Sequence, residues 1–118
     1  MMFDDDAMSE TLDTLDEAAL DELPFGVIGL DGENVVELYN THEARSSGLS
    51  RDRVVGRHFF FDVAPCMNNY MVAERLEEEQ LDATLPYVLT FRMRPTPVRL
   101  RLLRAAGSAR RWVLVSRG

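Results

Sequence analysis

The chain has 118 residues, 46% of them hydrophobic, which suits one compact domain with a single core. Its net charge of −7 repels the phosphate backbone of DNA and RNA, so we expect no nucleic-acid partner. All thirteen basic residues are Arg, and the lack of Lys excludes Schiff-base retinal, pyridoxal phosphate and the lysine of a phosphate-binding loop.

The N-terminal part of the chain predicts one helix followed by a β-hairpin. Residues 9–20 carry Leu and Ala at helical spacing after a candidate N-cap, Ser9. An apolar run at 24–30 ends in Asp31-Gly32, which is a turn signal, and a second apolar run follows at 35–39. These two runs predict the paired strands of the hairpin.

The middle of the chain predicts helical turns around a loop. Residues 40–47 are polar and predict short helical turns closed by Gly48, and residues 50–53 begin another short helix. Three Phe and a Val precede Ala-Pro-Cys in residues 58–66, which predicts a loop with a buried apolar start because Pro continues neither a helix nor a ladder. Residues 67–80 return to a helical pattern and predict the longest helix of the chain.

The C-terminal part predicts three strands. Apolar and polar residues alternate from Leu85 to Met93 and again over 98–103, and after a turn at Gly107-Ser108 a last apolar run covers 112–115. Two strands, several helices and three more strands predict an α+β fold. We expect a five-stranded antiparallel sheet with helices on one face and an N-terminal helical cap.

Charge is unevenly distributed along the chain. Twelve of the twenty acidic residues precede residue 38, whereas residues 83–118 hold eight Arg and no acid. This asymmetry fits two solvated faces, or an acidic N-terminal segment that docks on an Arg-rich face with a strength that falls with salt. We expect one domain over 1–118, with an acidic N-terminal cap over 1–23 and a core over 24–118.

The sequence predicts neither a membrane span nor a metal centre. No apolar run approaches the roughly 20 residues that cross a bilayer, and the N-terminus lacks the basic segment of a signal peptide, so we expect no membrane partner and a cytoplasmic location. The single cysteine, Cys66, excludes an internal disulfide, and together with His42 and His58 it does not make a metal site. Cys66 is therefore either a buried side chain that only packs in the core or a thiol that takes part in a reaction.

Several different short motifs are spread along most of the chain. They are Leu30-Asp31-Gly32, Tyr39-Asn40, Glu43, Val55-Gly56, Phe59-Phe60, Asp62 to Cys66, Met93 to Thr96 and Trp112-Val113. Together they closely resemble the photoactive yellow protein family, which has the PAS fold. The resemblance implies that Cys66 carries 4-hydroxycinnamic acid (p-coumaric acid) as a thioester, and that Tyr39 and Glu43 hydrogen-bond its phenolate oxygen. It also implies that Ser47 supports Tyr39, at a position where the family usually has Thr, and that Met93 lies near the ring and speeds recovery from the light-activated state.

Two features depart from the family pattern. Leu49 stands where the best-known members place an Arg over the phenolate ring, and the segment after Cys66 is shorter by a few residues. The Leu in place of Arg affects the expected colour of the bound group and its rate of recovery after light. The shorter segment affects the expected wall of the pocket beyond the cysteine.

The implied roles have physical reasons. A phenolate buried in a core is costly unless hydrogen-bond donors replace water, and Tyr39 can donate as a neutral phenol. Glu43 can donate only when protonated, which burial beside an anion favours. The helix expected after Cys66 would favour its thiolate through the positive end of the helix dipole. We expect light to move a proton from Glu43 to the phenolate, and the acidic N-terminal segment to detach in response.

The sequence therefore predicts a blue-light photoreceptor, not an enzyme, that acts as a monomer or weak dimer on a downstream signalling protein. The main alternative is a PAS module that binds a partner or dimerises without a chromophore. A flavin-type light sensor is disfavoured because Cys66-Met67-Asn68 does not match its Asn-Cys-Arg-Phe motif. A cysteine hydrolase would need a His and an orienting carboxylate, and the sequence around Cys66 supplies no such pair.

Overall fold

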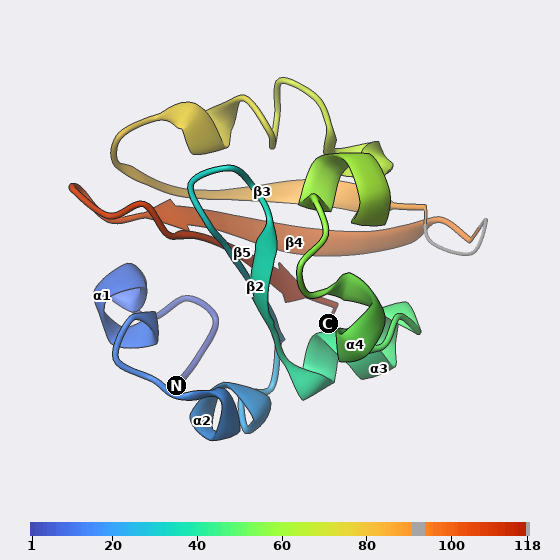
Figure 1. Cartoon of the computed structure of the whole chain (residues 1–118), viewed down its shortest axis with the longest axis horizontal. Coiled ribbons are helices and arrows are strands. Elements are labelled where there is room, and N and C mark those ends of the chain that lie inside the picture. Colours follow the sequence, from blue (N-terminus) through green and yellow to red (C-terminus); the bar gives the residue numbers. More distant parts are fainter. Residues whose placement is uncertain (91–93, 118) are drawn as a thin grey trace.

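The computed structural model describes residues 1–90 and 94–117 of the chain. Its strands, which form one antiparallel sheet in the order β2-β1-β5-β4-β3 (Figure 1), are β1 Gly26–Leu30, β2 Val36–Tyr39, β3 Leu81–Leu89, β4 Thr96–Arg104 and β5 Arg111–Ser116. The helices are α1 Met8–Leu12, α2 Glu17–Asp21, α3 Thr41–Ser47 and α4 Arg51–Val54, and the short helical turns are η1 Phe59–Val63, η2 Pro65–Met67 and η3 Arg75–Glu77. This architecture confirms the α+β fold with a five-stranded antiparallel sheet. Within the described residues, no helix combines the length and the apolar character of a membrane span.

The first hairpin and helix α3 form where the sequence predicts them. Asp31 Oδ1 accepts hydrogen bonds from the N–H groups of Glu33 at 2.8 Å and Val35 at 3.0 Å, which closes the turn between β1 and β2. Helix α3 begins after Asn40, whose side chain caps it, and ends at Gly48, whose φ of 78° is left-handed. The local turn and cap signals therefore predict this hairpin and this helix correctly.

The sheet is covered by apolar side chains on both faces. One cluster joins strands to the turns and helices that follow β2, and includes Ile28, Tyr39, Val54, Phe59, Met67, Leu102 and Val115. The other joins the N-terminal cap (residues 1–23) to the opposite face, and includes Met8, Leu12, Leu20, Val27, Leu103, Trp112 and Leu114. Neighbouring strand residues fall in different clusters because side chains alternate across a strand. The helices thus cover one face, as predicted, and the structure shows that the N-terminal cap covers the other.

The single helix predicted over 9–20 is wrong, because two short helices, α1 and α2, replace it. Ser9, predicted as the N-cap, lies inside α1 and is only 7% exposed. Asp16 caps α2 instead, where its side chain accepts a hydrogen bond from a first-turn N–H at 2.9 Å. The break between the helices lets Asp13 Oδ1 accept a hydrogen bond from Trp112 Nε1 at 3.0 Å. Two Asp side chains with partners of their own thus interrupt a pattern that periodicity alone reads as continuous.

The long helix predicted over 67–80 is also wrong. The turn η2 ends at Met67, and the rest of this described range contains the short turn η3 in place of a long helix. The Asn69 side chain donates to the Cys66 carbonyl at 3.2 Å and accepts from a nearby backbone N–H at 2.9 Å. Such bonds draw the backbone into turns that compete with a helix. Val72 and Leu76, both 0% exposed, still reach the core from this irregular path.

Two smaller differences concern the edges of elements. Strand β3 begins at Leu81, earlier than the predicted Leu85, because it pairs with β4 along its whole length. Residues 58–66, predicted as a loop, contain the turns η1 and η2. The predicted end of this strand at Phe91 and Met93 lies outside the described residues.

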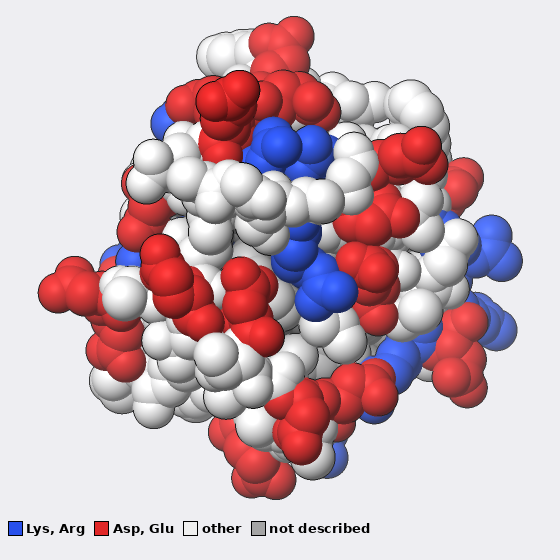
Figure 2. Space-filling view, turned by 60° about the vertical axis from the view of Figure 1, so that its left-hand side comes forward, with Lys and Arg blue, Asp and Glu red and all other residues white. Residues whose placement is uncertain are grey.

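The acidic N-terminal cap contacts basic residues of β4. Arg99 pairs with Asp4, with two hydrogen bonds of 3.2 Å, and Arg101 donates to the carbonyls of Phe3 at 2.8 Å and Asp5 at 2.7 Å. On one side of the molecule, acidic side chains surround a smaller group of basic ones (Figure 2). Of the two interpretations of the charge asymmetry, the structure shows the docking of the acidic segment on an Arg-bearing strand.

Candidate functional site

Asn40 organises the junction between β2 and α3. Its Oδ1 accepts hydrogen bonds from the N–H groups of Val27 at 2.9 Å and Glu43 at 3.1 Å, and its Nδ2 donates to the carbonyls of Leu20 at 2.9 Å and Phe25 at 3.0 Å. One buried amide therefore joins β1, α3 and the N-terminal cap. An Asn between a strand and a helix is a sequence signal for capping, but its long-range bonds have no local signal, and sequence reasoning missed them.

Tyr39 ends strand β2 with its phenol inside the protein. It is 2% exposed, and its hydroxyl lies 2.7 Å from Ser47 Oγ at the end of α3. Burial, reinforced by the negative charge of Glu43, raises the pKa of Tyr39 to about 12. The structure thus brings two predicted site residues together, and it keeps the phenol neutral at physiological pH.

Glu43 is 1% exposed, and its carboxylate meets a guanidinium that sequence reasoning did not identify. Arg117 Nη1 donates to Oε1 at 2.7 Å and Nη2 donates to Oε2 at 3.0 Å, so the pair is bidentate. Gly26 of β1 lies against the same carboxylate, where a Cβ would overlap Oε1 and lie 3.1 Å from Cδ. The acid is therefore enclosed by a strand that has no side chain at this point and by an arginine that follows β5.

Cys66 lies in the short turn η2, half-buried and with a free thiol. Its side chain packs against the same apolar cluster that contains Tyr39. The Tyr87 hydroxyl donates to the Cys66 carbonyl at 2.5 Å and Asn69 Nδ2 donates to it at 3.2 Å, which fixes the position of the turn. Since no long helix follows Cys66, the predicted activation of its thiolate by a helix dipole is wrong.

The other two predicted positions differ in what the structure shows. Leu49 is half-buried, packs against the cluster that contains Cys66, and borders a cavity of about 370 Å³ with Arg53 and Arg57. Met93, predicted to lie near the ring of a bound group, is outside the described residues.

Comparison with known proteins decides the family. No family model matches this chain. A photoactive yellow protein from Rhodothalassium salexigens is 32% identical over 119 residues, which cover 98% of this chain and 95% of that protein. The chain belongs to the photoactive yellow protein family. The predicted resemblance is thereby confirmed over nearly the whole chain.

Solved structures confirm the fold of this photoactive yellow protein family member. The photoactive yellow protein domain from the sensor histidine kinase Ppr of Rhodospirillum centenum is 38% identical, with a TM-score of 0.81 over 90% of this chain and 96% of that chain. The PAS domain of an HTR-like protein from Haloarcula marismortui, at 18% identity, has a TM-score of 0.59 over 92% of this chain and 95% of that chain. The chain is therefore a PAS domain of a photoreceptor family.

The contact between Gly26 and Glu43 predicts the effect of a single methyl group. Gly26→Ala should lower the free energy of unfolding by about 1–3 kcal/mol, because the new Cβ would overlap a carboxylate that is fixed by Arg117. Gly32→Ala is the matched control, since its Cβ would meet Ala109 Cβ at an ordinary 3.8 Å. Urea denaturation measures both variants, and equal midpoints would contradict the packing of Glu43 against β1.

The raised pKa of Tyr39 predicts a loss of stability in alkali. An unfolded Tyr ionises near pH 10, whereas Tyr39 in the folded chain has a pKa of about 12. The stabilising effect is complete below about pH 10 and is lost as pH rises through about 12, because the unfolded chain releases this proton first. Over that window, the free energy of unfolding should fall by up to about 1.4 kcal/mol per pH unit more steeply than in Tyr39→Phe. Parallel pH profiles of the two proteins in urea denaturation would refute this.

Proposed function

We propose that this chain is a blue-light photoreceptor that carries 4-hydroxycinnamic acid as a thioester on Cys66. The observation that carries the proposal is that the only thiol of the sequence and a buried neutral phenol, Tyr39, belong to one apolar region in a chain of this family. When bound, the hydroxycinnamoyl group supplies absorption of blue light and isomerisation of its double bond. The residues of the chain hold this group, stabilise its phenolate oxygen, and convert a proton movement into a change of contacts.

Cys66 is proposed as the point of attachment. Its Sγ, as a thiolate, forms a bond to the acyl carbon of an activated hydroxycinnamoyl thioester, while the bond to the original thiol breaks and that thiol leaves as a thiolate. A half-buried side chain is accessible to such a reagent and still borders the apolar cluster. The two hydrogen bonds to its carbonyl hold the turn in place during this exchange.

Tyr39 and Ser47 fit the role of a donor to a buried anion. Ser47 Oγ accepts a hydrogen bond from Leu49 N–H at 3.1 Å, so its own proton can point to the Tyr39 oxygen 2.7 Å away. The phenolic proton of Tyr39 is then available to a bound phenolate. A phenol is neutral at physiological pH, and burial raises the pKa of Tyr39 further, so this donor is present at all physiological pH values.

Glu43 is proposed as the second donor and as the group that loses a proton after light absorption. A carboxyl group donates only in its protonated form, so Glu43 must hold a proton on one Oε in the dark, loaded protein. Loss of that proton leaves a carboxylate at a position that is 1% exposed, where a charge is tolerated only beside a partner of opposite charge. The rearrangement that brings a partner to this charge is the proposed source of the conformational change.

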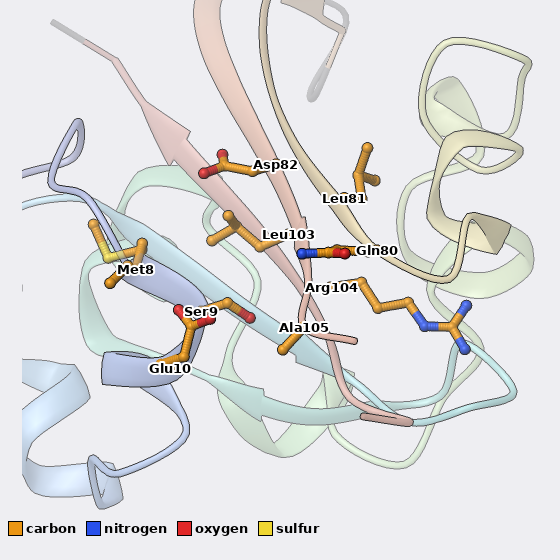
Figure 3. A pocket seen from close by; sticks show the side chains of 10 residues that line it. Met8, Ser9, Glu10, Gln80, Leu81, Asp82, Leu103, Arg104 and Ala105 are labelled. Atoms are coloured by element: carbon orange, nitrogen blue, oxygen red, sulfur yellow. The ribbon is translucent and has the colours of Figure 1, made fainter. Parts of the chain in front are cut away.

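The N-terminal cap is the segment that we propose to detach. A cavity of about 300 Å³ lies between α1 and the place where β3 begins and β4 ends. The residues that line it include Met8, Ser9, Glu10, Gln80, Asp82 and Leu103 (Figure 3). Ser9 is 7% exposed, and its buried hydroxyl has no hydrogen-bond partner in the described part of the chain. A boundary with a cavity and an unsatisfied buried hydroxyl is less stable than a well-packed one, which favours opening at this place.

A second candidate function is a PAS module that binds a signalling partner or a second copy without a chromophore. The bidentate pair with Arg117 favours it, because an acid already satisfied by a guanidinium does not require a ligand. Exposed apolar side chains also favour a contact surface: Tyr70 is 71% exposed and Val88 is 53% exposed. In either case we propose that the chain acts in the cytoplasm, as a monomer or weak dimer, on a downstream protein.

Reconstitution separates the two functions. Incubation with an activated hydroxycinnamoyl thioester should give a visible absorption band and a mass increase of one acyl group, and Cys66→Ala should give neither. Glu43→Gln should retain the adduct but shift the band, since the donor survives without its acidic proton, whereas Glu37→Gln, at an exposed acid of β2, should not shift it. A colourless wild-type protein of unchanged mass would favour the chromophore-free module.

Light should loosen the N-terminal cap of the reconstituted protein. We expect residues 1–25 to lose amide protection on illumination while β4 and β5 keep theirs, because the cap is bound to the sheet by side chains and does not share in its ladder. Hydrogen exchange in the dark and in the light measures this. Glu43→Gln, which lacks the transferable proton, should respond less. Equal protection of residues 1–25 in both conditions would rule out detachment.

A further inference from the structure

Arg117 is the partner of Glu43 in this structure, and the contact is well formed. Both guanidinium Nη groups donate to separate carboxylate oxygens, at 2.7 Å and 3.0 Å, with side-chain exposures of 18% for Arg117 and 2% for Glu43. Paired charge-assisted bonds of this fork geometry are among the strongest polar contacts in proteins. The carboxylate is therefore stabilised as an anion inside the molecule.

This contact and the donor role proposed for Glu43 exclude each other. A carboxylate that accepts two guanidinium bonds has no proton to give, whereas a donor to a buried phenolate must be protonated. The side chain of Glu43 also has little freedom, since Gly26 closes one side of it. Glu43 therefore has two alternative states: ionised and held by Arg117, or protonated and released from it.

We propose that Arg117 is the counter-ion of Glu43, and that their ion pair forms whenever Glu43 is ionised and opens whenever Glu43 is protonated. The pair is closed in the structure, and we expect it to be closed in the protein without a chromophore. For the loaded protein the inference rests on the proposed function: the pair is open in the dark and closes after Glu43 releases its proton. Arg117 is thus a positioning residue that stabilises the bleached, light-activated state and delays the return of the proton.

The surroundings of Arg117 allow both positions of its side chain. A surface cavity of about 300 Å³ is lined by Arg117 together with Pro97, Val98, Arg99 and Ser116. A guanidinium released from Glu43 can be solvated at this opening without burial of its charge.

Arg51, a cation at the same junction, has partners of its own. Arg51 donates to the Tyr39 carbonyl at 2.8 Å and pairs with Asp21 and Glu17. Leu49 adds no charge at the position where the family resemblance would place an Arg. Arg117 is therefore the cation that the structure assigns to the buried acid.

The first experiment uses the chromophore-free protein. The infrared difference spectrum of wild type minus Glu43→Gln should contain carboxylate bands and no carbonyl band of a protonated acid. Arg117→Gln should shift these carboxylate bands, because the bidentate contact is lost, and Arg75→Gln, which removes the same charge from an exposed pair with Glu78, should not. The loss of melting temperature caused by Arg117→Gln should also shrink to less than half in the Glu43→Gln background.

The second experiment uses the reconstituted protein and measures the lifetime of the bleached state after a flash. Arg117→Gln should shorten it roughly tenfold, as expected for loss of a charge-assisted pair, while Arg117→Lys should fall between this variant and wild type. Arg75→Gln should stay within about twofold of wild type. An unchanged or longer lifetime in Arg117→Gln would overturn the assignment, and so would carboxylate bands that do not respond to it.

The two experiments separate failure of the counter-ion from failure of the photoreceptor. If wild type forms an adduct that bleaches in light but neither readout responds to Arg117→Gln, Arg117 is not the counter-ion and the proposed function stands. If wild type forms no adduct, the proposed function fails and the infrared result alone decides the ion pair.

Discussion

The fold depends at its centre on how it accommodates one buried carboxylate. Glu43 is 1% exposed, and a charge at such a position is tolerated only with a partner of opposite charge and with its oxygens hydrogen-bonded. Three distant segments meet to satisfy it. Asn40 caps α3 and so orients the helix that carries Glu43, Gly26 leaves space on β1, and pairing of Gly26 with Val115 brings Arg117 to the same point. The ion pair therefore links the register of the sheet to the start of a helix.

The same junction connects the buried acid with the N-terminal cap on the opposite face of the sheet. The amide of Asn40, three residues before Glu43, binds both the Glu43 N–H and the carbonyl of Leu20 in α2. The Asp21 carboxylate accepts a hydrogen bond from the N–H of Thr41, the first residue of α3. A shift of α3 caused by a change of charge at Glu43 would therefore act directly on the contacts that hold α2. Few contacts separate Glu43 from the N-terminal cap, because the start of α3 and the cap are joined directly by hydrogen bonds.

The sequence predicts those parts of the fold whose signals are local. The turn at Asp31, the helix closed by Gly48 and the alternation within β4 are confirmed, because each depends on residues within a few positions of one another. The predicted helices over 9–20 and 67–80 are wrong where Asp16 and Asn69 bond to the backbone and end the periodic path. In both places apolar spacing correctly indicated burial, but side-chain to backbone bonds decided the local conformation.

The candidate site shows the same limit. Family motifs predict Cys66, Tyr39, Glu43 and Ser47 as site residues, and both this assignment and their roles toward a bound group stay predictions. Arg117 could not be found in this way, because 74 residues separate it from Glu43 and nothing around it differs from an ordinary strand end. Only the order of the strands, with β5 beside β1, brings the two together.

The contacts around the proposed ligand site respond differently to a proton. The Cys66 carbonyl is held by a phenol and an amide, and Tyr39 is held by a serine hydroxyl, so these bonds join neutral groups. The contact between Glu43 and Arg117 differs, because its attraction exists only while Glu43 is ionised. A proton that leaves or returns to Glu43 therefore changes the force between α3 and the end of β5, whereas the bonds to the Cys66 carbonyl join neutral groups and do not depend on that charge. By this argument the buried acid, and not the thiol of Cys66, is the group whose change of protonation would alter the contact between α3 and the end of β5.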